Sequence, residues 1–145
     1  MLSDELIARA EAAVAGLTKN YGGWVRGDLA RLKESLRKLE EARGDEAAVL
    51  EHRAVLRTVA HDMASVAGTF GYDLVTSIGR QLCDYLDALD LREPVNVALV
   101  DIHARALETV VTRQISGDGG ALGREIMNAF GTAVAQSLAG TSRVD

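Results

Sequence analysis

The sequence predicts an all-α protein, folded as an antiparallel up-down four-helix bundle with an additional helix at each end. Apolar residues recur at three- and four-residue intervals along most of the chain, which is the spacing of one face of an α-helix. The 145 residues include a single proline, and no stretch alternates apolar and polar residues long enough to predict a sheet. The long amphipathic segments are joined by short breaks, and helices joined by short loops pack as antiparallel neighbours.

Six helical segments are predicted, and their ends coincide with residues that cap or break helices. The segments span about residues 3–19, 24–43, 45–70, 73–91, 94–116 and 121–138. Ser3 or Asp4 is the expected N-cap of the first segment, because a short oxygen-bearing side chain accepts hydrogen bonds from the free N–H groups of a first helical turn. The adjacent glycines Gly22 and Gly23 are expected to end this segment.

The boundaries in the middle of the chain are predicted on the same grounds. Gly44 suits the left-handed position that follows a helix, and Asp45 suits the N-cap of the next helix. Gly71 is expected to end the third segment, and Asp73 is expected to cap the fourth. The sequence therefore predicts short, well-defined turns on both sides of the third segment.

The last boundaries involve the proline and a glycine-rich loop. Pro94 is expected in the first turn of the fifth segment, where a missing N–H group costs nothing. The residues 117–120 are expected to form a loop before the last segment. We interpret residues 1–145 as one domain whose bundle core spans about residues 24–116.

Composition argues against several classes of function. The chain has 16 Lys and Arg against 21 Asp and Glu, a formal net charge of −5, which argues against nucleic-acid binding through a positive surface. The start of the chain lacks the basic and apolar regions of a secretion signal, and no run of about 18 apolar residues predicts a membrane span. Cys83 is the single cysteine, so no disulfide forms within the chain. We expect a cytoplasmic protein that binds neither nucleic acid nor membrane.

Three histidines are the first candidates for chemistry, and helical spacing distinguishes them. His61 is two residues from Val59 and two from Met63, which belong to the apolar stripe of the third segment. At 100° per residue it points almost opposite that stripe, toward solvent. Most of its neighbours on that face are small, so another molecule has room to approach. The alternative is an incidental surface histidine.

The other candidates have structural interpretations. His52 is expected at the end of the bundle core, and His103 is expected to be at least half-buried with one hydrogen-bond partner. Metal or haem ligation is the alternative for both, but His52 and His61 lie on opposite helix faces and cannot hold one ion together. Cys83 is expected to be a small packing residue.

The segment from Ala60 to Tyr72, AHDMASVAGTFGY, resembles the signature of histidine-containing phosphotransfer (HPt) domains. That signature is H-x-[ILM]-K-G-x-[SA]-x-x-[hydrophobic]-G. The chain matches it without a gap at His61, Met63, Ala67, Phe70 and Gly71. The run from Gly68 to Tyr72 is especially similar to the phosphoacceptor domains of chemotaxis histidine kinases.

The resemblance implies a role in a bacterial two-component phosphorelay. His61 would accept a phosphoryl group and pass it to or from an aspartate of a response regulator, so the chain would be a phosphocarrier and not a turnover enzyme. The implied partners are a response-regulator receiver domain, a sensor histidine kinase, or both. No intrinsic cofactor or metal site is expected, and Mg²⁺ would come with the response regulator. We expect a monomer rather than a dimer.

The chain departs from the signature at two positions, where Ala64 replaces the lysine and Ser65 replaces the glycine. Arg57 lies one helical turn before His61 on the same face, and we expect it to supply the missing positive charge. The resemblance implies a docking face around His61. Its expected members are Ala54, Thr58, Ala64, Ser65, Gly68, Tyr72, Thr76 and Gly79.

Two other functions are weighed against the phosphocarrier. The first is an HPt-like docking module that binds or sequesters response regulators and transfers phosphate poorly, which the missing lysine favours. The second is an unrelated helical bundle that binds a ligand or mediates oligomerisation. Phosphorylation of His61 distinguishes the phosphocarrier from both.

Overall fold

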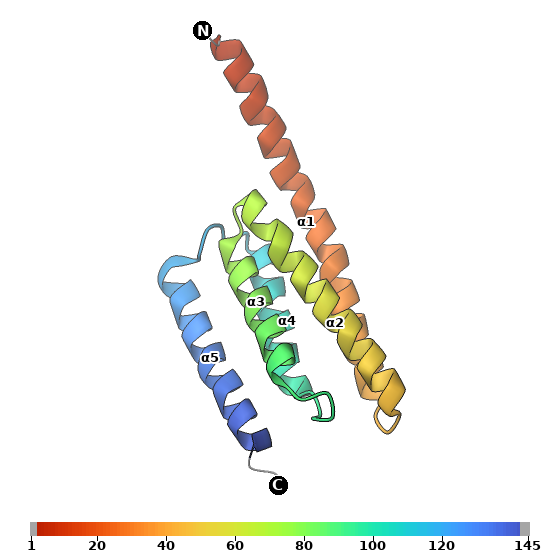
Figure 1. Ribbon diagram of the computed structural model, residues 1–145. Coiled ribbons are helices and arrows are strands. Elements are labelled where there is room, and N and C mark those ends of the chain that lie inside the picture. Colours follow the sequence, from red (N-terminus) through yellow and green to blue (C-terminus); the bar gives the residue numbers. More distant parts are fainter. Residues whose placement is uncertain (1–2, 143–145) are drawn as a thin grey trace.

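The computed structural model describes residues 3–142, and only the backbone at positions 14, 15, 17–20, 141 and 142. All regular structure in this range is helical, which confirms the prediction of an all-α protein. The helices are α1 (Asp4–Glu41), α2 (Glu46–Ala67), the short 3₁₀ helix η1 (Gly68–Phe70), α3 (Asp73–Ala88), α4 (Val97–Thr112) and α5 (Gly120–Ser142). Successive α-helices run in alternating directions (Figure 1).

The helix α1 is continuous through Gly22 and Gly23, so the break predicted there is wrong. Each glycine inside a helix costs about 1 kcal/mol relative to alanine. Tyr21 directly precedes the pair and Val25 follows it by two residues; they are 3% and 1% exposed, so their packing offsets this cost. Ser3 is the N-cap, as predicted. The first part of α1 extends past the ends of the other helices (Figure 1).

The turns on both sides of α2 form where they were predicted. Gly44 is left-handed, with φ 97°, and the Asp45 side chain accepts a hydrogen bond from the Ala48 N–H at 3.1 Å. After η1, Gly71 is also left-handed, with φ 83°. Only glycine adopts this conformation without strain, so these turns are encoded locally.

Four of the later boundaries differ from the prediction. Asp73 is the first residue of α3 rather than its cap, and α3 ends at Ala88 rather than near residue 91. Pro94 lies before α4 and not in its first turn, because Asn96 is the N-cap and accepts a hydrogen bond from the Leu99 N–H at 3.1 Å. The helix α4 ends at Thr112, four residues earlier than predicted.

The helices α1 to α4 pack in a ring in which each contacts two others, and α5 is added to it. The helix α1 contacts α2 and α4, α3 also contacts α2 and α4, and α5 packs against α3 and α4. The core lies between these helices. Its largest fully buried side chains are Tyr85, Leu32, Leu56, Met63, Leu74, Ile78, Leu82, Leu86, Leu107, His103, Val25 and Val75. The face of α2 that is directed away from this core is the one that carries His61.

Candidate functional site

His61 lies on the solvent-exposed face of α2. Its side chain is 60% exposed, as the apolar periodicity predicts. Val59 and Met63, two residues away on either side, are buried in the core. The Nδ1 atom of His61 is 3.6 Å from Oδ1 of Asp62, which is too long for a hydrogen bond. Among the described residues, Nε2 is therefore the ring nitrogen that has no carboxylate beside it.

The helix around His61 offers an open surface. The predicted neighbours Ala54, Thr58, Ser65 and Gly68 are all exposed. The Ser65 hydroxyl donates a hydrogen bond to the His61 carbonyl at 2.8 Å, so it lies against its own helix. These side chains are short, and none of them shields the imidazole.

Two residues predicted for the docking face, Ala64 and Gly79, are instead buried where α2 meets α3. A Cβ atom added at Gly79 would be 3.0 Å from the Cβ of Ala64 and 3.1 Å from the carbonyl oxygen of Ala60. Thr76 is half-buried, and its hydroxyl donates a hydrogen bond to the Ala64 carbonyl at 2.9 Å. These three residues form the contact beneath the face and do not project from it.

Tyr72 is also half-buried, but at a different place. Its ring lies 5.2 Å from that of Tyr21, which in turn stacks on Phe70 at 4.8 Å. Trp24 meets Phe70 edge-on at 5.9 Å. Tyr72 therefore belongs to an aromatic cluster that joins α1 to η1.

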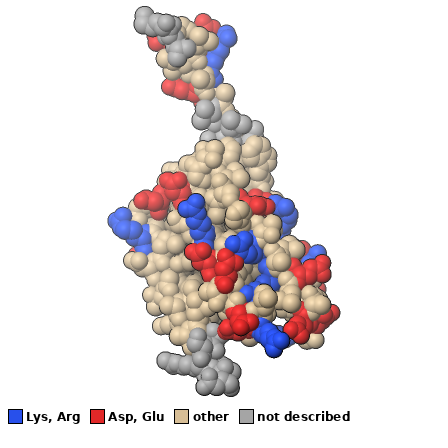
Figure 2. Space-filling model, in the orientation of Figure 1, with Lys and Arg blue, Asp and Glu red and all other residues tan. Residues whose placement is uncertain are grey.

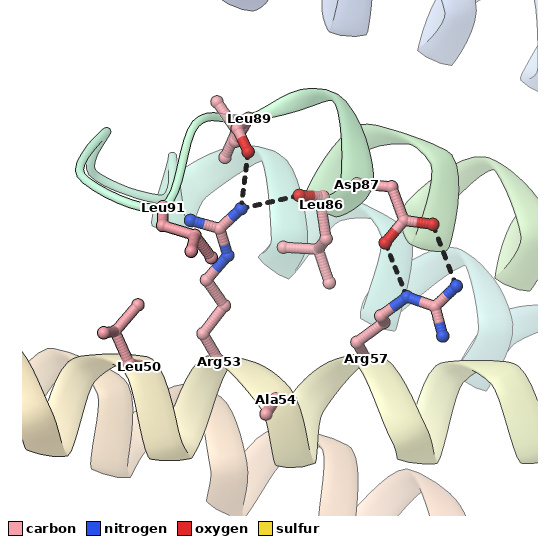
Figure 3. Close-up of a pocket in the computed structure, with 8 residues that line it drawn as sticks. All are labelled: Leu50, Arg53, Ala54, Arg57, Leu86, Asp87, Leu89 and Leu91. Carbon is pink, nitrogen blue, oxygen red and sulfur yellow. Dashed lines mark hydrogen bonds and ion pairs between the residues drawn. The ribbon is translucent and has the colours of Figure 1, made fainter.

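Arg57 is held by an acidic partner from α3. Its Nε donates to Oδ1 of Asp87 at 2.6 Å and its Nη2 donates to Oδ2 at 2.8 Å (Figure 3). This arrangement keeps the pKa of Asp87 below its usual range and raises that of Arg57. The positive charge that Arg57 was expected to supply to His61 is therefore paired with Asp87 in this structure.

A groove of about 340 Å³ begins one to two turns from His61, between α2 and the end of α3. It is lined by Leu50, Arg53, Ala54, Arg57, Leu86, Asp87, Leu89 and Leu91 (Figure 3). Leu91 is 68% exposed, so the groove opens on an apolar side chain. Basic and acidic side chains lie side by side over the surface that α2 and α3 form (Figure 2).

Arg53 forms one wall of this groove, and sequence reasoning did not identify it. Its guanidinium is buried and donates to the carbonyl oxygens of Leu86 at 2.7 Å, Leu89 at 2.9 Å and Asp90 at 3.0 Å. It thereby satisfies free carbonyl groups at the C-terminal end of α3. Arg53 lies seven residues before Ala60, and residues seven apart share a helix face. This spacing indicates that Arg53 lies on the same face of α2 as the buried Ala60.

The other candidate residues have structural surroundings. His103 is fully buried, with Nδ1 2.8 Å from the Leu99 carbonyl oxygen and Nε2 3.1 Å from the Gln81 amide. It therefore has two hydrogen-bond partners rather than the one predicted. His52 is half-buried, and Cys83 is buried as expected.

Residues 3–142 contain no group of three or more His, Cys, Asp or Glu side chains placed to hold a metal ion. None of the described helices combines the length and apolar character that crossing a membrane requires. Comparisons of the chain with family models, with curated proteins and with solved structures found no match.

Proposed function

We propose that this chain is a histidine phosphotransfer protein that carries a phosphoryl group on His61. The observation that supports this function best is the exposed imidazole in the C-terminal half of α2, with short side chains around it and a groove one to two turns away. The assignment of a four-helix bundle is part of the same proposal. The second part of α1 together with α2, α3 and α4 would form the antiparallel four-helix bundle, and α5 and the first part of α1 would be additions.

The proposed reaction uses the imidazole as a nucleophile. The lone pair of Nε2 forms the N–P bond while the P–O bond to an aspartate of a receiver domain breaks, and the carboxylate leaves with that electron pair. The proton on Nδ1 stays there or passes to water, and the Asp62 carboxylate stabilises positive charge on the ring. Mg²⁺, which the receiver would bring, would neutralise charge on its own aspartyl phosphate.

The receiver domain would dock on the exposed face of α2. Ala54, Thr58, Ser65 and Gly68 surround His61 there without steric obstruction. The groove beside Arg53 would accept an apolar side chain of the partner, because Leu50 and Leu91 line it. We therefore place docking on α2 and the α2–α3 groove, and not on Ala64 or Gly79.

A second candidate function is docking without transfer. It is favoured by the ion pair between Arg57 and Asp87, which occupies the nearest basic residue on the face of His61. Ala64 has no positive charge either, at the position where the HPt signature has a lysine. In this case the protein would bind receivers and sequester them.

Transfer from a ³²P-labelled receiver domain tests the proposal. Receivers of the same organism are phosphorylated and mixed with the parent chain, with His61→Gln and with His52→Gln, a matched change on the same helix. We expect an acid-labile, base-stable label on the parent and on His52→Gln only. A label that persists on His61→Gln would overturn the assignment of His61. Receiver binding without any label would favour the docking module.

A further inference from the structure

We infer that Arg80 of α3 is the catalytic cation of this site and that it contacts the phosphoryl group while that group is transferred to or from His61. This inference rests on the proposed function. Arg80 was not among the candidate residues from the sequence, and the packing of α3 on α2 is what places it beside the site.

The register of the two antiparallel helices locates Arg80. Arg57 of α2 faces Asp87 of α3 through their ion pair. Ala64 follows Arg57 by seven residues, and Arg80 precedes Asp87 by seven, so positions 64 and 80 face each other in the same way. The contact of Ala64 with Gly79, the residue before Arg80, independently supports this register.

The direction of the Arg80 side chain follows from the same spacing. Seven residues are close to two helical turns, so Arg80 and Asp87 project from the same side of α3. Asp87 reaches across the exposed edge of the α2–α3 contact to Arg57. Arg80 is also exposed and therefore lies along this edge, about two turns from Asp87. His61 lies on α2 between Arg57 and Ala64, which puts it next to Arg80.

The surroundings leave Arg80 available for a phosphoryl group. Its side chain makes no hydrogen bond or ion pair with any residue that the structure describes. Arg57 and Arg53, the basic residues of α2 nearest to His61 in sequence, are bound to Asp87 and to carbonyl oxygens. Ala64 is buried against Gly79 and places no long side chain on this edge. A guanidinium extending over Ala64 could donate to two phosphoryl oxygens at once.

The chemistry requires such a cation. Negative charge is spread over the three equatorial oxygens of a transferring phosphoryl group, and catalysis depends on positioning and on neutralising that charge. Removing one donor from an enclosed active site costs about 10²–10³-fold in rate. This face is partly open to water, so we expect a smaller loss, about 10-fold, for Arg80→Ala.

Single-turnover transfer at saturating receiver concentration tests the inference. We expect Arg80→Ala to lower the rate about 10-fold, and Arg80→Lys to keep part of it because the charge remains. The matched control is Arg124→Ala, an exposed arginine on α5, which does not pack against α2. Its rate should equal that of the parent. Equal rates for Arg80→Ala and the control would overturn the assignment.

A spectroscopic measurement separates contact from an indirect effect. The ³¹P NMR signal of phosphorylated His61 should move in Arg80→Ala, because the guanidinium is lost from the phosphoryl oxygens, and should not move in Arg124→Ala. An unmoved signal in Arg80→Ala would overturn the contact even if the rate fell. A parent chain that is never phosphorylated by any receiver would instead overturn the proposed function, so the two failures are distinguishable.

Discussion

Gly79 of α3 packs so closely on Ala64 of α2 that a Cβ atom at position 79 would be 3.0 Å from the Ala64 Cβ. The carbonyl oxygen of Ala60 would be 3.1 Å away on the same side. Neither neighbour is the end of a flexible side chain, so neither can move aside cheaply. This contact sets how closely α2 and α3 approach each other, and it fixes the register that places α3 residues near His61.

Gly79→Ala should therefore destabilise the protein. The added methyl group overpacks the contact at a cost of about 1–3 kcal/mol, and the higher helix propensity of alanine returns only about 1 kcal/mol. The matched control is Gly27→Ala in α1, where a Cβ would meet nothing within 4 Å. That change should stabilise the protein by about 0.5–1 kcal/mol. Urea denaturation measures both, and the same sign for the two variants would contradict the prediction.

The ion pair of Arg57 and Asp87 should contribute little to stability. The two side chains are 43% and 51% exposed, and exposed pairs are worth about 0–1 kcal/mol. A double-mutant cycle with Arg57→Ala and Asp87→Ala measures the coupling. Because the pKa of Asp87 is lowered in the folded state, the contribution is present above the ordinary aspartate pKa. It should disappear as the pH falls through the folded pKa, and a coupling that persists below it would contradict this account.

Arg53→Ala should destabilise the protein far more than the loss of an exposed arginine does. The guanidinium is buried and bonded to three carbonyl oxygens at the end of α3. Losing it leaves the buried carbonyl oxygens of Leu86 and Leu89 unsatisfied, and we expect a loss of about 2–4 kcal/mol in the free energy of unfolding. Arg92→Ala, in the exposed loop after α3, is the control and should change stability by less than about 0.5 kcal/mol. Equal losses in thermal or urea denaturation would show that the Arg53 bonds carry no stability.

His103 should make the stability depend on pH. Burial lowers the pKa of His103 in the folded state, so the unfolded chain binds this proton first as the pH falls. The free energy of unfolding should therefore decrease from about pH 6.5, the ordinary histidine pKa, down toward the lower folded pKa. Above that range His103 is neutral in both states and adds no slope. Denaturation between pH 7.5 and 5 should give a flatter profile for His103→Gln, and an unchanged profile would assign the slope to other groups.

Local patterns were sufficient for much of the fold. Gly44 and Gly71 adopt the left-handed conformation that only glycine adopts freely, and Asp45 caps α2, so these turns could be predicted from neighbouring residues. Gly22 and Gly23 show the limit of such reasoning. Their effect on a helix is only about 1 kcal/mol each, and the burial of Tyr21 and Val25 outweighs it.

The sequence by itself determined that His61 points away from the core, because a side chain's direction relative to its own helix follows from the 3.6-residue repeat. It did not determine what lies across from α2. Only the tertiary structure decided that Ala64 is covered by Gly79 and that Arg57 is bound by Asp87. The physical reason is that the register between two helices depends on how closely their small residues let them pack, and periodicity along one helix carries no information on its neighbour.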